Sequence, residues 1–214
     1  MSVLVYIESE NNKFKKSSYE ALSYGKALSE KMGVKVSGLV INCSDAESLK
    51  AYGPDKILKI DSQDLNEFSS KKYAHAIADV IKSENANVVV LSSTPDSKYL
   101  GAHLSGITDS PFVSNVVELP ESINPFTVKR TCFTNKAFSL TELISDTKII
   151  SITSNSYGLI ENSNDSKTEE IDIKSIDSDQ RILNIEKESG SVTIADAEIV
   201  VSAGRGLKGP ENWG

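Results

Sequence analysis

The sequence is poor in the residues that usually build catalytic and metal sites. Its 214 residues include two cysteines, two histidines and one tryptophan. Cys43 and Cys132 form no CxxC pair, so we expect buried structural thiols rather than a metal or redox centre. We expect His75 to be exposed on a helix and His103 to pack on an inner helix face. No Ser-His-acid grouping, HExxH motif or Walker loop can be assembled, so the sequence predicts no catalytic residue and no metal ligand.

Long apolar runs and an excess of positive charge are also missing. No segment approaches the ~18 consecutive apolar residues of a membrane span. The N-terminus lacks the basic start of a secretory signal and the arginines of a mitochondrial one. We therefore expect a cytoplasmic protein without membrane insertion. The net charge of −7 argues against nucleic acid as a partner, because the phosphate backbone binds basic surfaces.

What the sequence does contain is an alternation of strand and helix patterns. Apolar, strand-like runs occur at Val3–Ile7, Lys35–Ile41, Lys56–Ile60 and Val88–Leu91, with helical patterns between them. The last run is continuous, which is typical of a central parallel strand covered on both faces. The spacing fits right-handed crossover connections. We predict an α/β fold: a Rossmann-like, mostly parallel open sheet with helices on both faces.

Serine residues predict where the helices begin. Ser17-Ser18-Tyr19-Glu20 and Ser44-Asp45-Ala46-Glu47 both have the spacing of a capping box. A further helix is expected from Ser97, as its N-cap, to Thr108. The loop before it, Ser92–Ser97, could cradle a phosphate at the helix N-terminus or could be an ordinary turn. Because this loop has no glycine to let backbone amides converge, we favour the turn.

Beyond residue 111 strand patterns follow one another without helices between them. Phe112–Leu119, Thr127–Phe133 and Lys136–Leu143 predict an antiparallel addition to the sheet, with a tight turn at Thr134-Asn135. Lys148–Thr153 is one more apolar strand.

The remaining chain becomes polar and then apolar again. Glu161–Glu188 carries nine acidic and four basic residues, a pattern typical of a solvated segment, with strand-like pieces such as Glu170–Ile176. Ala197–Ser202 predicts a new strand. We divide the chain into a Rossmann-like domain at 1–160, an acidic connector at 161–196, and, at 197–214, the first strand and Gly-Arg-Gly loop of a second domain that is cut short.

The loop Gly204-Arg205-Gly206 is the one candidate binding element. The glycines let the backbone turn closely, and arginine offers a planar, permanently charged fork that pairs with phosphate or stacks on a flavin ring. The loop follows the end of a predicted strand, where open α/β sheets bind ligands. The alternative is an ordinary surface arginine. Arg205 is the single predicted cofactor-binding residue.

Segments along the whole chain, in order, resemble electron transfer flavoprotein alpha subunits. Val3–Glu8 resembles the family's "VLVYAE" opening, Tyr52–Ile57 its "GADKV" turn, and Asn135–Ala137 part of its hairpin. Val200–Trp213 resembles the "VVSGGRGLKSGENF" motif that opens the family's second domain, and this match is the most specific. The departures from that motif are Ala203 for glycine, Gly209-Pro210 for Ser-Gly and Trp213 for phenylalanine.

The resemblance implies a subunit of a heterodimeric FAD carrier rather than an enzyme. Such a carrier takes electrons from dehydrogenases, typically the acyl-CoA dehydrogenases of fatty acid beta-oxidation, and passes them to a membrane quinone oxidoreductase and the respiratory chain. The first domain, an adenine nucleotide alpha hydrolase-like fold, would pack with the beta subunit as a scaffold, and Arg205 would approach the flavin. Because most flavin contacts lie in the family's second domain, we expect this chain alone to bind no FAD tightly. The alternative is a self-contained nucleotide-binding α/β module.

Overall fold

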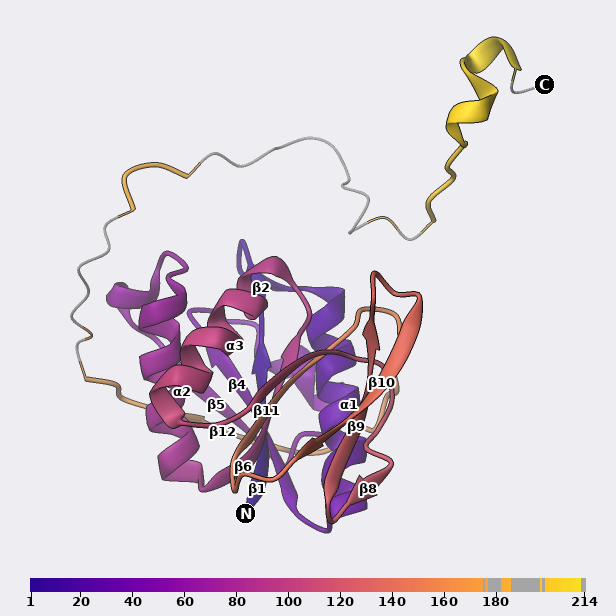
Figure 1. The fold of residues 1–214 in the computed structure, drawn as a ribbon. Helices are drawn as coiled ribbons and strands as arrows, with labels where there is room; N and C mark the ends of the chain where they lie inside the picture. The colour runs from indigo at the N-terminus through magenta and orange to yellow at the C-terminus, as the bar shows by residue number, and fades with distance from the viewer. Residues whose placement is uncertain (175, 177–181, 186–196, 198, 213–214) are drawn as a thin grey trace. The chain divides into compact units, whose positions relative to one another are not determined.

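The computed structural model describes residues 1–174, 176, 182–185, 197 and 199–212. Contacts divide the chain into a first unit, Met1–Gln180, and a second unit, Arg181–Gly214, and each is described here by itself. The first unit is an α/β domain in which helices lie on both faces of one large sheet (Figure 1). The α/β class predicted from the sequence is therefore confirmed.

Among the described residues, ten strands form the sheet. They are β1 Ser2–Ile7, β4 Lys35–Ile41, β5 Lys56–Ile60, β6 Ala86–Ser92, β7 Phe112–Val116, β8 Ser122–Ile123, β9 Phe126–Cys132, β10 Ala137–Leu143, β11 Lys148–Ile152 and β12 Lys167–Glu170. Their order is β10-β9-β7-β11-β6-β1-β4-β5-β12, and β8 pairs with β9. The short strands β2 Ser9–Glu10 and β3 Lys13–Phe14 form a separate hairpin.

The order of the strands has a reversal at its centre. From β1 the chain moves outward through β4 to β5 on one side, and then returns to β6 on the other side of β1. Every pair from β12 to β7 is parallel, whereas β9 runs antiparallel to β7, and β10 antiparallel to β9. The predicted parallel sheet with an antiparallel addition is therefore confirmed. The reversal between β1 and β6 is the place where open α/β sheets bind ligands.

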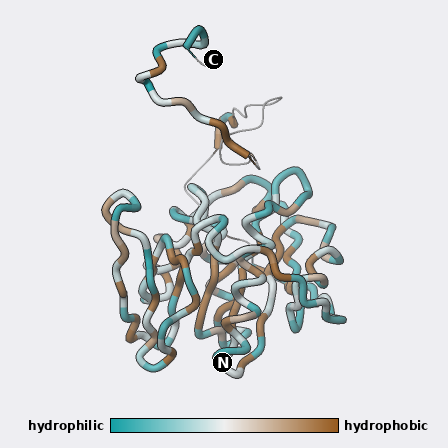
Figure 2. The backbone as a smooth tube through the Cα atoms, turned by 90° about the vertical axis from the view of Figure 1, so that its right-hand side faces the viewer, coloured by the Kyte–Doolittle hydropathy of each residue, from teal (hydrophilic) through white to brown (hydrophobic). Residues whose placement is uncertain are grey.

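The helices divide between the two faces of the sheet. They are α1 Lys16–Met32, α2 Ser70–Glu84 and α3 Pro95–Thr108, with the 3-10 turns η1 Glu47–Tyr52 and η2 Gln63–Leu65. Alternate residues of a strand point to opposite faces, so Val5 packs in one core cluster with Leu22 of α1. Tyr6 packs in the other cluster, with Ile77 of α2 and Leu100 of α3. Figure 2 shows the apolar segments running through the middle of this domain.

Both predicted capping boxes are wrong. The N-cap residue of α1 is Lys15, which makes no side-chain cap, and that of η1 is Ala46. The side chains predicted to cap their own helix bind elsewhere in the fold. Ser18 donates a hydrogen bond to the carbonyl of Glu8 at 2.9 Å, and the carboxylate of Glu20 accepts from the backbone amides of three residues, Asn155, Tyr157 and Gly158. Ser18 and Glu20 thus bind residues outside their own helix instead of the amides of its first turn.

The N-cap of helix α3 lies three residues earlier than predicted. It is Thr94, whose hydroxyl accepts from the amide of Ser97 at 3.1 Å, and Pro95 occupies the first turn. Proline is well suited to that position because its missing N–H would have no helical partner there. Ser97 is therefore inside the helix, and its side chain is free to face the sheet.

The tight turn predicted at Thr134-Asn135 is confirmed. Both residues and Phe133 have positive φ, and the amide of Lys136 donates to the carbonyl of Phe133 at 3.1 Å. This turn joins β9 and β10 into a hairpin that forms one end of the sheet (Figure 1).

Part of the acidic segment lies on the sheet. The amide of Asn162 donates to the carbonyl of Ala51 at 2.8 Å, and β12 extends the sheet beside β5. Lys56 of β5 pairs with Glu169 of β12 at 3.3 Å. The isoleucines that follow β12 pack against the core cluster of α2 and α3: Ile171, Ile173 and Ile176. The strand predicted within 170–176 thus lies earlier, at Lys167–Glu170. It covers the edge of β5, which would otherwise be free. The residues 175, 177–181 and 186–196 of the predicted connector lie outside the described residues.

Among its described residues, the second unit contains the 3-10 turns η3 Arg205–Leu207 and η4 Pro210–Asn212. The strand predicted at 197–202 is wrong for its described residues 199–202, which take no strand conformation. Val201 is 94% exposed, and a strand needs a neighbour for its backbone groups; the described residues supply none. In the part of the chain that the structure describes, no helix has the length and apolar character needed to cross a membrane.

Candidate functional site

The reversal point of the sheet is occupied by the side chain of Glu8. This residue directly follows β1, and only 5% of it is exposed. Its Oε1 accepts a hydrogen bond from the hydroxyl of Ser97 at 2.5 Å and a second from the hydroxyl of Thr94. Both donors lie in the first turn of α3, which follows β6. The carboxylate therefore bridges the two strands at the position where a bound ligand would be expected.

The charge of Glu8 suits this position. A helix N-terminus carries a partial positive charge and free N–H groups, so it favours an anion. Lys15 places its Nζ 3.6 Å from Oε2 of Glu8, while Oε2 makes no hydrogen bond within the described part of the chain. The arrangement is that of a helix N-terminus with an anion bound, except that the anion is the protein's own carboxylate.

The sequence of the loop Ser92–Ser97 allows either a phosphate cradle or a turn, and the structure favours the turn. Its hydroxyls are directed to the protein: Ser92 donates to the carbonyl of Ser17 at 3.1 Å, and Ser93 pairs with Ser151 at 3.0 Å. Together with the contacts of Ser97 to Glu8, these bonds favour the turn. The sequence interpretation missed Glu8; the available signal was an acidic residue immediately after a fully apolar strand.

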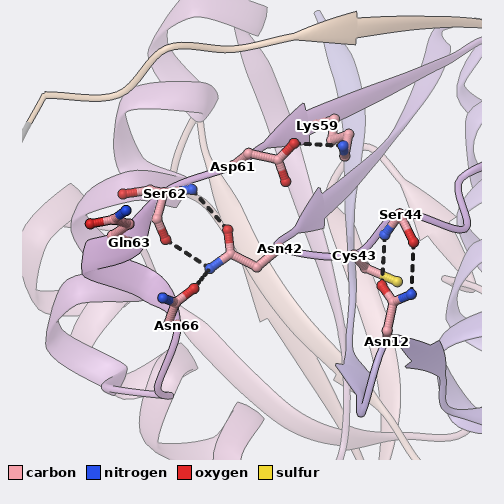
Figure 3. A pocket seen from close by; sticks show the side chains of 9 residues that line it. All are labelled: Asn12, Asn42, Cys43, Ser44, Lys59, Asp61, Ser62, Gln63 and Asn66. Carbon is pink, nitrogen blue, oxygen red and sulfur yellow. Dashed lines mark hydrogen bonds and ion pairs between the residues drawn. The ribbon is translucent and has the colours of Figure 1, made fainter.

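A polar pocket lies beside this point, at the carboxyl ends of β4 and β5 (Figure 3). Its volume is about 520 Å³. The side chain of Asn42 accepts from the amide of Ser62 and donates to its carbonyl, each at 2.8 Å. The side chain of Asn12 donates to the hydroxyl of Ser44 at 2.7 Å and accepts from its amide at 2.8 Å. These amides join the loops after β2, β4 and β5 to one another.

The polar side chains of the pocket bind one another and so connect the surrounding loops. Its opposite charges, Lys59 and Asp61, pair with each other at 2.5 Å. Cys43 lies in its wall with a buried side chain (Figure 3). Within the described residues no group of histidine, cysteine and acidic side chains is arranged to hold a metal ion. Among the described residues that line this hollow, the only charges are those of Lys59 and Asp61, which compensate each other.

The remaining chemically active side chains are dispersed. His75 is exposed on α2, as predicted. The prediction for His103 is wrong, because it is exposed on α3. That helix turns a narrow stripe, including Leu100 and Leu104, to the core, so a residue three positions after Leu100 already faces solvent. The expectation of a buried thiol holds for Cys43, whereas Cys132 at the end of β9 is partly exposed.

Arg205 lies in the second unit, at the first position of η3, and its side chain is exposed. An added Cβ at Gly204 or at Gly206 would meet no atom within 4 Å. The backbone on either side of Arg205 is therefore uncrowded among the described residues. The role of Arg205 in binding a flavin stays a prediction.

Comparison with known proteins places these observations in a family. The chain is 25% identical to the electron transfer flavoprotein subunit alpha of Bacillus subtilis, over 99% of this chain and 66% of that protein. It is 22% identical to protein FixB of Clostridium saccharobutylicum, with the same two coverages. A shorter match, 23% identical over 58% of this chain and 35% of the other protein, is to the acryloyl-CoA reductase electron transfer subunit beta of Anaerotignum propionicum.

The chain thus spans about two thirds of the length of the relatives that it matches throughout. The family model described as the electron transfer flavoprotein domain matches residues 3–178, which include all of the sheet except Ser2, the helices on both of its faces and the site of Glu8. The chain therefore belongs to the electron transfer flavoprotein family.

Proposed function

We propose that this chain is part of the alpha subunit of a heterodimeric, cytoplasmic electron carrier that holds FAD. The carrier takes electrons from dehydrogenases such as acyl-CoA dehydrogenases and passes them through a membrane quinone oxidoreductase to the respiratory chain. It is a carrier rather than an enzyme. The relatives named above as alpha subunits of electron transfer flavoproteins support this proposal.

Within that carrier the first unit serves as a scaffold that packs with the beta subunit. The observation that carries this assignment is the carboxylate of Glu8 at the N-terminus of α3. A nucleotide phosphate needs that position in a fold of this kind, and here the protein has filled it. We propose further that the scaffold domain extends through β12, because this strand completes the sheet, and that the second unit begins the flavin-binding domain.

FAD, when bound, supplies the redox chemistry through its isoalloxazine ring. Arg205 is the residue of this chain that we assign to the flavin. Its guanidinium stays charged at every physiological pH, and a fixed positive charge beside the ring stabilises the negative charge of the reduced form. Gly204 and Gly206 support this role, because neither places a side chain between the backbone and the ring.

A self-contained nucleotide-binding module is the alternative function. The polar pocket beside β4 and β5 is the observation in its favour, since its volume of about 520 Å³ would admit a small polar molecule. Isothermal titration of the chain with ATP and with AMP separates the two proposals. The scaffold role predicts no binding at micromolar concentrations of chain, whereas saturable one-to-one binding would favour the module.

Electron transfer itself tests the carrier function. The full-length protein, purified with its beta subunit and FAD, is mixed without oxygen with an acyl-CoA dehydrogenase and its substrate. We expect the flavin absorbance of the carrier to bleach in proportion to the substrate added, with only trace dehydrogenase present. No bleaching with any dehydrogenase of the same organism would contradict the proposed function.

A further inference from the structure

The outer side of α3 is unusual for a surface helix because it carries almost no charge. The charged residues of this helix are Asp96 and Lys98, both near its start, and the ten residues Tyr99–Thr108 that follow include no acid, lysine or arginine. A helix on the surface of a soluble domain usually buries one apolar stripe and turns charged residues to the solvent. Over most of its length α3 does the first and not the second.

This uncharged side of the helix is nevertheless exposed. Tyr99 is 69% exposed and Ile107 is 38% exposed, and three residues between them are exposed as well: Ala102, His103 and Gly106. Positions three, four, seven and eight after Tyr99 lie on one side of a helix. An added Cβ at Gly106 would meet no atom within 4 Å. These five residues form the outer face of α3, which the described part of the chain leaves uncovered.

The neighbouring helix α2 shows the usual arrangement. It lies beside α3 on the same face of the sheet (Figure 1), and both helices bury apolar side chains in the same core cluster. The exposed side of α2 includes His75, Asp79 and Lys82 at helical spacing, two of them charged. The position on the sheet therefore does not require an uncharged outer side. Exposed apolar surface of this kind marks a site of interaction.

Two opposite charges stand at the two ends of the outer face of α3, on the same flank. Lys98 lies near the start of the helix and Asp109 is its C-cap, and both are exposed. Eleven positions, about three turns, separate them, so they fall on the same side of the helix. Asp96, two positions before Lys98, falls on the other flank. Within the described residues neither Lys98 nor Asp109 forms an ion pair.

A second copy of the same helix complements these charges. A twofold axis that lies in the contact plane, perpendicular to the helices, sets two copies of α3 antiparallel and brings the same flank of each together. Lys98 of each copy then faces Asp109 of the other, once at each end of the contact. Tyr99 of one copy lies at the level of Ile107 of the other. The positive end of each helix dipole also lies beside the negative end of its partner.

We infer that the outer face of α3 docks a second copy of this chain, in a twofold contact of two antiparallel α3 helices. This goes beyond the proposed function, because two carriers, each of one alpha and one beta subunit, would then associate through their alpha subunits. A helix of 14 residues is about 21 Å long. The contact is therefore small, and we expect a dissociation constant in the micromolar range.

Sedimentation equilibrium of the full-length protein, purified with its beta subunit, tests this contact. Over a range of about 1 to 300 µM, the mass should rise from that of one alpha–beta pair toward that of two. Tyr99→Glu/Ile107→Glu places two acids in the outer face, and we expect it to weaken the association about tenfold or more.

The matched control places the same two acids on the neighbouring helix. His75→Glu/Ser83→Glu has the same spacing of eight positions, and both residues are exposed on α2. It should associate within about twofold of the wild type, because it adds the same charge away from the contact. Thermal melting checks that each variant is folded, and Tyr99→Glu alone, at a position 69% exposed, provides a milder variant of the outer face.

Charge reversal tests the antiparallel, twofold geometry. Lys98→Asp makes acid face acid at both ends of the contact, and Asp109→Lys makes base face base, so each should weaken the association about fivefold. The double variant Lys98→Asp/Asp109→Lys exchanges the two charges and should associate as the wild type does. A double variant weaker than either single variant would contradict the geometry.

The outcomes separate this contact from the heterodimer. A wild type that remains one alpha–beta pair at every concentration would show the inference to be wrong, and so would an association that Tyr99→Glu/Ile107→Glu leaves unchanged. The full-length alpha chain alone is measured in parallel. If it associates through the outer face and the beta subunit abolishes this, the beta subunit is the occupant and the inference fails. If no beta subunit binds, the proposed function fails, and the association of the alpha chain alone decides the inference.

Discussion

The hydroxyl of Ser97 donates to the carboxylate of Glu8 at 2.5 Å, across 89 positions of sequence. The bond joins the end of β1 to the first turn of α3, the two elements on either side of the point where the strand order reverses. Folds of this kind commonly hold a phosphate at that position. In this chain the side chain of Glu8 occupies it. This relationship supports the proposed scaffold role over that of a nucleotide-binding module.

Removal of the Glu8 carboxylate should destabilise the first unit. Glu8→Ala leaves the hydroxyls of Thr94 and Ser97 without their acceptor and the helix N-terminus without its anion, and we expect a loss of about 2–3 kcal/mol in the free energy of unfolding. Glu8→Gln keeps one acceptor oxygen and should lose about half as much. Urea unfolding at neutral pH measures both. The control is Glu67→Ala, an exposed acid, which should change stability by less than about 0.5 kcal/mol.

Truncation should show that the sheet includes part of the acidic segment. A chain ending at residue 176 keeps β12 and the isoleucines that pack on the core, so it should unfold at the same urea concentration as the 214-residue chain. A chain ending at residue 160 exposes the edge of β5 and loses those isoleucines. It should be less stable by about 3 kcal/mol or more. Equal stability of the two shorter chains would show that β12 contributes nothing to the fold.

Tyr73 should contribute to a loss of stability at high pH. Burial, and secondarily the negative charge of Asp96, raise its pKa from 10.0 to about 12, and its hydroxyl donates to the carbonyl of Leu65 at 2.8 Å. The unfolded chain releases this proton near pH 10, whereas the folded chain keeps it. The stabilisation is complete below pH 10 and declines at about 1.4 kcal/mol per pH unit up to about pH 12.

Tyr73→Phe tests this linkage. Below pH 10 the variant should be less stable than the wild type by about 1 kcal/mol, because the hydrogen bond to Leu65 is lost. Above pH 10 the difference should shrink and then reverse, because phenylalanine has no proton to release. Free energies of unfolding of both proteins, measured between pH 8 and 12, show the two slopes. Parallel slopes would contradict the assignment.

Arg205 should set the potential of the flavin in the loaded carrier. Arg205→Gln removes a positive charge beside the proposed ring position, so the reduced flavin becomes less favourable and the two-electron midpoint potential falls. We expect a decrease of about 30 mV or more, which corresponds to about 1.4 kcal/mol. Arg205→Lys keeps the charge and should shift the potential less. Spectroelectrochemical titration measures each potential, and equal values in all three proteins would remove Arg205 from the flavin site.

The parts of the fold that follow from local pattern were predicted well. The strands Lys35–Ile41 and Lys56–Ile60 match the structure at both ends, because strands that are largely buried are rich in Val, Ile and Leu. β12, by contrast, reads Lys-Thr-Glu-Glu and is exposed along its whole length. An edge strand that buries no side chain leaves no apolar alternation in the sequence, so only its pairing with β5 reveals it.

The starts of the helices and the position of Glu8 were not predicted correctly, and the reason is different. Ser18 and Glu20 have the spacing of a local cap, yet their partners are Glu8 and a loop more than 130 positions further on. The role of Glu8 depends on α3 being beside β1, which follows from the strand order and not from any short motif. Ser18 and Glu20 could chemically serve as caps of their own helix, but contacts with residues far away in the sequence determine which hydrogen bonds they make.

The flavin content of the full-length protein purified with its beta subunit tests the central claim most directly. The absorbance spectrum of the purified pair, read against its protein concentration, gives the number of flavins per heterodimer. We predict one FAD per pair, and no stoichiometric flavin on the 214-residue chain after dialysis against excess FAD. A pair that remains colourless after incubation with FAD would contradict the proposed carrier.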